Sequence, residues 1–151
     1  MATLQCGLSK IDFRNVGAPL KNLAYIPAKT ENGNSVNVVI DSGSSINLCD
    51  QQLAESLNCP ILKSKNPVQV ICSSGQRLTV DKYISFGLIS ENGITFGCQD
   101  FYIVKNLQTP ILAGLPFLMQ KNAVINFGTG YITMKKAGKT ANFRLKGIFL
   151  N

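Results

Sequence analysis

The residues best suited to chemistry lie in one short segment, Asp41-Ser42-Gly43-Ser44. Asp41 ends an apolar run (SVNVVID, residues 35–41) and enters a turn in which Gly43 lets backbone amides approach the carboxylate. Ser42 and Ser44 add hydroxyl donors on either side of the glycine. A carboxylate with donors around it at the end of a dry strand suits general acid–base catalysis. The alternative is an ordinary turn in which the Asp41 side chain is only a cap.

The composition narrows the chemistry further. The chain has 151 residues, no His and no Trp. The absence of His excludes His-based triads, His general bases and mixed Cys/His zinc sites. We therefore expect carboxylates, thiols, hydroxyls or backbone groups to carry any reaction, with no metal and no cofactor.

The five cysteines form an odd and widely spaced set without a C-x-x-C pair. This pattern predicts neither a disulfide framework nor a zinc knuckle. We expect buried or half-buried thiols in a reducing compartment. The cysteines are Cys6, Cys49, Cys59, Cys72 and Cys98.

The charge is basic, with 15 Lys and Arg against 8 Asp and Glu and a formal net charge of +7. The basic residues are scattered, so the charge favours solubility and weak polyanion association over a specific nucleic-acid site. The longest apolar run, residues 111–119, is far shorter than the ~20 residues that span a bilayer. The first ten residues lack the apolar core of a signal peptide. We expect neither a specific nucleic acid nor a membrane as partner.

Short strands separated by turns dominate the pattern, which predicts a mainly β fold with two short helices. Asp50 is a suitable N-cap for the first helix, and Pro116 fits the first turn of the second. Strands are expected at residues 22–29, 35–41, 67–72, 76–80, 83–90, 94–104, 123–127 and 131–134, and helices at 50–58 and at the end of 111–118. Residues 83–90 and 94–104 are expected to pair as a hairpin. Residues 1–20 and 135–151 are less patterned, and we interpret them as an N-terminal arm and a C-terminal basic arm around one domain, residues 21–134.

Three segments together resemble the retropepsin family, the aspartic proteases of retroviruses and retrotransposons. They are VVIDSGSSINL, the glycine-tipped hairpin ICSSGQRLTV, and ILAGLPFL followed by NAVINF. Their order and spacing are closest to those of gypsy-type elements and reverse-transcribing viruses. Leu112-Ala113-Gly114 matches the second motif of the family. The resemblance covers residues 21–134 and implies a small, closed, barrel-like half of an acid protease.

The resemblance also implies a function. The chain has one such motif, whereas the reaction needs two carboxylates, so the active enzyme would be a C2 homodimer with Asp41 from each copy. The two carboxyls would share a proton, one activating a water and the other polarising the scissile carbonyl. The expected substrate is an extended peptide in a retroelement Gag-Pol-type polyprotein. The expected location is the cytoplasm or a virus or virus-like particle, without secretion.

Further roles follow from the same resemblance. Ser42 would brace the dyad across the dimer, and the Gly43 carbonyl would accept a hydrogen bond from the substrate. Ser44 would donate to the Asp41 carboxylate, or alternatively be satisfied within its own turn. Residues 67–80 would form a flap over the substrate, with Ser73, Ser74, Gly75 and Gln76 at its tip. The candidate pocket residues are Val39, Ile46, Leu48, Ile71 and Leu112.

The chain departs from immunodeficiency-virus-type members of the family at two places. Ser45 or Ile46 and Leu115 stand where those enzymes have acidic residues and an Arg, so the ion-pair network of that group cannot form. Dimer contacts would then be apolar or involve the terminal arms. Two alternatives stay open: an inert or cellular retropepsin-fold module for dimerisation or peptide binding, and, on charge alone, a nucleic-acid-associated domain.

Overall fold

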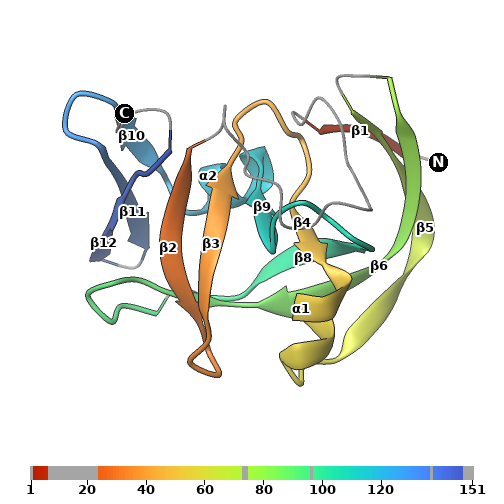
Figure 1. Cartoon of the computed structure of the whole chain (residues 1–151), viewed down its shortest axis with the longest axis horizontal. Helices are drawn as coiled ribbons and strands as arrows, with labels where there is room; N and C mark the ends of the chain where they lie inside the picture. Colours follow the sequence, from red (N-terminus) through yellow and green to blue (C-terminus); the bar gives the residue numbers. More distant parts are fainter. Residues whose placement is uncertain (1, 7–23, 73–74, 96, 137, 148–151) are drawn as a thin grey trace.

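The computed structural model describes residues 2–6, 24–72, 75–95, 97–136 and 138–147 (Figure 1). Within them the chain is mainly β with two short helices, as the sequence pattern predicts. The strands are β1 (Ala2–Cys6), β2 (Tyr25–Thr30), β3 (Ser35–Ile40), β4 (Leu48–Asp50), β5 (Ile61–Cys72), β6 (Arg77–Phe86), β7 (Leu88–Ile89), β8 (Gln99–Val104), β9 (Ile111–Ala113), β10 (Val124–Asn126), β11 (Tyr131–Lys136) and β12 (Lys139–Arg144). The helices are α1 (Gln51–Ser56) and α2 (Leu115–Gln120).

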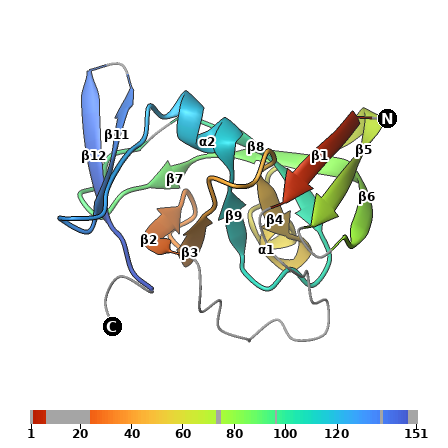
Figure 2. The same cartoon turned by 90° about the horizontal axis from the view of Figure 1, so that it is seen from above.

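Nine strands form one strongly curved sheet in the order β1-β5-β6-β8-β4-β9-β3-β2-β7. In Figure 1 the long strands β5 and β6 curve along one side of the molecule. Strands β10, β11 and β12 form a second, antiparallel sheet at the opposite side (Figure 2). Backbone hydrogen bonds between Tyr25 and Lys146 join the two sheets.

Two apolar clusters stabilise this arrangement. The larger one lies between the two sheets and includes Val38, Ile84, Phe101, Ile132 and Phe143, all fully or almost fully buried. The smaller one joins the half of the β5–β6 hairpin nearest its turn to the strands after Asp41. It consists of Ile46, Leu48, Val68, Val70, Val80, Val104, Leu107 and Leu112. The smaller cluster therefore ties the predicted flap to the predicted active-site floor.

The local sequence explains both helices. The Asp50 carboxylate accepts a hydrogen bond from the Gln52 amide at 3.1 Å, so Asp50 is the N-cap predicted for α1. In α2 a proline occupies the first turn, where its missing N–H costs nothing. The C-cap of α2 is Lys121, a buried residue whose ammonium donates to the Gly97 carbonyl at 2.8 Å.

The predicted hairpin of residues 83–90 and 94–104 is confirmed near its base and is interrupted between its base and its turn. Residues 83–86 of β6 do pair with 99–102 of β8, but the ladder ends at Gly87. The Gly87 amide donates to the Glu31 carboxylate at 3.2 Å, and β7 then pairs with β2. The turn at Gly93 remains, closed by an isolated bridge between Ile89 and Thr95.

The two terminal segments contain strands that the sequence pattern did not predict. Residues 139–144 form β12, and Ala141, Phe143 and Leu145 are buried in the larger cluster. This part of the C-terminal segment is therefore packed into the fold. Its basic side chains make the alternation of buried and exposed residues hard to recognise in the sequence. At the other end, β1 pairs with β5, while residues 7–20 of the expected N-terminal arm lie outside the described residues.

Candidate active site

Asp41 lies directly after β3 in a turn that its own groups close. Its side chain is 5% exposed, and its Oδ1 accepts a hydrogen bond from the Gly43 amide at 3.0 Å. Its carbonyl accepts from the Ser44 amide at 3.1 Å. The next two residues, Ser42 and Gly43, are exposed. The turn thus places a nearly buried carboxyl beside backbone that a peptide or a second chain can reach.

The second motif holds this turn from the other side. The Asp41 amide donates to the Ala113 carbonyl at 2.9 Å, and the Leu115 amide donates to the Ser44 carbonyl at 2.8 Å. Strand β9, which carries the motif, pairs with β3 before the turn and with β4 after it. The Asp41 turn and the second motif are therefore joined by main-chain hydrogen bonds at both ends of the turn.

Gly114 makes this close approach feasible. A Cβ at position 114 would lie 2.2 Å from the Ile46 carbonyl oxygen and 2.7 Å from that of Ser44. Both atoms belong to the backbone, so they cannot rotate away. The glycine of the second motif is required because the active-site turn packs directly on it.

Asn47 is a positioning residue that the sequence analysis missed. Its side chain is 3% exposed, and its Oδ1 accepts from the Gly114 amide at 2.9 Å and from the Phe117 amide at 3.3 Å. Its Nδ2 donates to the Asp100 carbonyl at 3.2 Å. One amide thus satisfies groups at the start of α2 and in β8 while lying six residues after Asp41. The available signal was a polar residue between two apolar ones, Ile46 and Leu48.

Ser44 is buried and uses its hydroxyl within the loop. Its Oγ donates to the Ile46 carbonyl at 2.8 Å and accepts from the Ile46 amide at 3.3 Å. These contacts match the alternative in which the Ser44 hydroxyl is satisfied within its own turn. A hydroxyl has one proton, so a bond to the Asp41 carboxylate would require the Ser44 proton to leave Ile46. That bond stays a prediction.

Three of the five candidate pocket residues lie side by side in the sheet. Leu112 of β9 is in register with Val39 of β3 on one side and with Leu48 of β4 on the other. Leu48, Leu112 and Ile46 belong to the smaller apolar cluster. Ile71 of β5 is half-buried and lies outside that cluster. The floor residues are therefore brought together, and as pocket linings they remain predictions.

The predicted flap is the tip of the β5–β6 hairpin, in which residues 68–71 pair with 77–80. Gly75 has a φ of +87°, a conformation that glycine adopts without strain. Gln76 is half-buried, whereas Ser73 and Ser74 lie outside the described residues. Both strands extend well beyond the predicted bounds, so the hairpin is a long arm whose base belongs to the main sheet.

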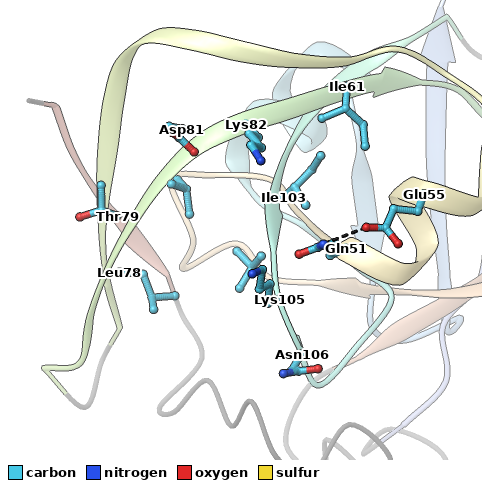
Figure 3. A pocket seen from close by; sticks show the side chains of 12 residues that line it. Gln51, Glu55, Ile61, Leu78, Thr79, Asp81, Lys82, Ile103, Lys105 and Asn106 are labelled. Carbon is cyan, nitrogen blue, oxygen red and sulfur yellow. Dashed lines mark hydrogen bonds between the residues drawn. The ribbon is translucent and has the colours of Figure 1, made fainter.

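A cavity of about 700 Å³ lies between α1, β6 and the end of β8 (Figure 3). Its walls carry charges of both signs, including Glu55, Asp81, Lys82 and Lys105. Gln51 donates to Glu55 across part of this wall at 2.8 Å. Leu78, Thr79 and Val80 of the predicted flap line this cavity, but none of the predicted catalytic, pocket or flap-tip residues does, so it is not the site of the proposed chemistry.

Other chemistry finds less support in the described part of the chain. No group of three or more His, Cys, Asp or Glu is gathered there as a metal site would require. Burial beside Asp50 raises the pKa of the Cys49 thiol to about 12, which keeps it protonated and unreactive. Neither described helix is long and apolar enough to cross a membrane.

Comparison with known proteins agrees with this geometry. The family model of the PEG10/RTL1 protease domain matches residues 37–142, which include the Asp41 turn, the β5–β6 hairpin and Gly114. The crystal structure of the retroviral protease-like domain of Ddi1 from Leishmania major matches with a TM-score of 0.57 and 13% sequence identity. The match covers 86% of this chain and 98% of that one, and it shows a shared fold. No curated protein matches the chain. The predicted retropepsin resemblance is confirmed: the chain belongs to the family of the PEG10/RTL1 protease domain and has a retropepsin-like fold.

Proposed function

We propose that two copies of this chain form an aspartic endopeptidase, with the Asp41 carboxyl of each copy at a shared site. One observation carries the proposal: a nearly buried carboxyl is held in a turn that the Gly114 motif fixes from behind. A chain that used Asp41 only as a turn cap would not need this second, distant segment. The exposed Ser42 and Gly43 then offer the backbone through which a partner copy and a substrate make contact.

The second copy follows from the chemistry. The chain contains a single Asp-Ser-Gly motif, and hydrolysis through an activated water needs both a base and an acid. Two carboxyls ~3 Å apart do not both ionise readily, so they hold one proton between them. The ionised carboxyl takes a proton from the water as it attacks the scissile carbonyl carbon. The protonated carboxyl donates to the carbonyl oxygen, and no covalent intermediate forms.

The substrate that fits this site is an extended peptide. Strand β5 can accept it as an added strand only in place of β1, which pairs with its outer edge, and the apolar floor around Leu112 can accept alternate side chains. A natural substrate would be a junction in a retroelement polyprotein, cleaved in the cytoplasm or in a particle. The family relationship supports this proposal.

Replacement of the carboxyl tests the activity. Asp41→Asn keeps the Oδ1 acceptor of the Gly43 amide but cannot supply the charge, so peptide cleavage should fall by about 10²–10⁴-fold with the fold retained. Asp100→Asn changes an exposed carboxyl on β8 and is the matched control. Cleavage of a peptide library at the wild-type rate by the Asn variant would refute the protease.

Mixing the two chains tests the shared site. An excess of Asp41→Asn chain should suppress wild-type activity, because mixed dimers contain one carboxyl instead of two. Activity that depends only on the amount of wild-type chain would show a complete site in one copy. A well-folded dimer that cleaves nothing, but binds extended peptides, would instead favour the inert-module alternative.

A further inference from the structure

Strand β1 occupies the outer edge of the predicted flap. Its backbone runs parallel to β5, in register from Ala2 opposite Val68 to Cys6 opposite Cys72. The other edge of β5 pairs with β6 over residues 68–71. Among the described strands β1 is the last of the nine-stranded sheet. Strand β5 is therefore paired on both of its edges along this stretch, and one of the two partners is a terminal segment of the same chain.

The occupied edge lies beside the proposed catalytic site. Val68 and Val70 of β5 are buried in the smaller apolar cluster, together with Ile46, Leu48 and Leu112 of the floor. Both views place β1 on the side of β5 that faces the loop between β3 and β4, which begins at the catalytic turn (Figures 1 and 2). Strand β1 thus lies where an extended peptide would lie between the flap and the floor.

The pairing of β1 has an energetic consequence for any peptide that uses this edge. Strand addition satisfies the N–H and C=O groups of a sheet edge, and one edge accepts one strand at a time. Because β1 belongs to the same chain, its pairing is intramolecular and does not weaken when the protein is diluted. A peptide binds only the fraction of molecules in which the edge is open, so its apparent affinity falls by that fraction.

We propose that β1 is an autoinhibitory strand, whose main-chain pairing with residues 68–72 closes the flap edge to extended peptides. A peptide gains the edge only when β1 leaves it. The pairing lies outside the Asp41 turn, so release of β1 should lower KM and leave kcat unchanged. That the blocked peptide is a substrate rests on the proposed function, whereas the closure of the edge does not.

Proline substitutions in the full chain can release β1. Adjacent residues of a strand direct their amides to opposite edges, so either the Thr3 or the Leu4 amide is directed at β5. Proline has no N–H, and the double variant Thr3→Pro/Leu4→Pro therefore removes that donor whichever residue carries it. Thr3→Ala/Leu4→Ala retains both amides and is the matched control. A difference between the two variants then reports the backbone pairing.

Peptide binding tests the closure without any activity measurement. The probe is a fluorescein-labelled peptide of residues 1–8 carrying Cys6→Ser, added to each double variant in an Asp41→Asn background, which cannot cleave it. We expect fluorescence anisotropy to show binding about tenfold or more tighter in the proline variant than in the alanine variant. Equal affinities would overturn the proposal.

Hydrogen exchange gives a second measurement that needs no variant. In the wild-type chain the amides of residues 68–72 that do not bond to β6 should be protected from exchange, and the protection should persist on dilution. Exchange at the rate of an open edge would overturn the proposal. So would protection that disappears on dilution, because β1 would then come from another copy.

Cleavage of a peptide selected from the library tests the inhibitory role. We expect KM to be about tenfold or more lower in the proline variant than in the alanine variant, with equal kcat. Equal KM values would overturn the inhibition. Tighter binding of the probe by a chain that cleaves nothing in any variant would confirm the closure and contradict the proposed function.

Discussion

The Gly114 backbone lies so close to Ile46 that a Cβ at position 114 would approach the Ile46 carbonyl oxygen to 2.2 Å. The residue after Gly114 donates to Ser44, and Gly114 itself donates to Asn47. The loop that follows Asp41 and the loop that begins α2 are therefore one packed unit. Any change that separates them should alter the position of the carboxyl.

Gly114→Ala is the most direct test of this unit. The added methyl meets two backbone oxygens, so we expect a loss of about 3 kcal/mol or more in the free energy of unfolding. Activity per folded molecule should fall as well. The control is Gly128→Ala, where a Cβ meets only the Asn126 side chain at 3.2 Å. Urea unfolding of both variants gives the comparison, and equal midpoints would mean that the loops separate at little cost.

Asn47 should affect the site through α2. Asn47→Leu keeps the side-chain volume but leaves buried backbone groups of Gly114, Phe117 and Asp100 without their hydrogen-bond partner. Each unsatisfied group should lower the free energy of unfolding by about 1–3 kcal/mol. A lower kcat in the protein that remains folded would show a positioning role, and a purely structural role would change only the melting temperature. Asn37→Leu, at an exposed position of β3, is the matched control.

Ser44→Ala separates the two interpretations of that hydroxyl. With its proton directed at Ile46, removal should cost about 0.5–1.5 kcal/mol of stability and leave the acidic limb of the rate profile in place. A hydroxyl bonded to the carboxylate would instead stabilise its charged form, so its removal would move that limb to higher pH. The profile is measured at two enzyme concentrations, because dissociation of the dimer at low pH could imitate the shift.

Cys49 predicts a pH dependence of stability. Burial raises its pKa in the folded chain to about 12, above the ordinary thiol value of 9.0. The unfolded chain therefore releases this proton first, and the corresponding stability is present below pH 9 and is lost as the pH rises toward 12. Cys49→Ala should reduce the loss of unfolding free energy between pH 9 and pH 12, as measured by urea unfolding. Cys98→Ala, at an exposed position, should leave it unchanged.

A statine-type inhibitor should stabilise the assembled site. Its hydroxyl takes the place of the attacking water, so it binds where two Asp41 carboxyls meet. Because the proposed site exists only in a dimer, a saturating inhibitor should raise the melting temperature and reduce its dependence on protein concentration. Asp41→Asn should show no such shift. An equal rise of the melting temperature in that variant would show that the inhibitor binds at another site.

Local patterns were sufficient for the parts of this protein whose causes are local. The apolar run in residues 35–41 predicted a strand, which β3 forms with Val36, Val38 and Ile40 buried, and Asp50 and Pro116 predicted where the helices begin. The order of the Asp-Ser-Gly turn, the glycine-tipped hairpin and Gly114 was enough to identify the family. Each of these signals lies within a few residues of the structure it determines.

Only the tertiary structure decided which distant groups meet. Asn47 contacts Gly114 across 67 residues of sequence, and no periodicity marks such a partner. Strand β1 pairs with β5, and β12 pairs with β11, and the local sequence of β1 and of β12 does not mark these partners. The contacts of the Ser44 hydroxyl with the Ile46 backbone likewise depend on the path of the loop and not on a pattern in the sequence. Chain sequence set the local conformations, and packing determined the contacts between them.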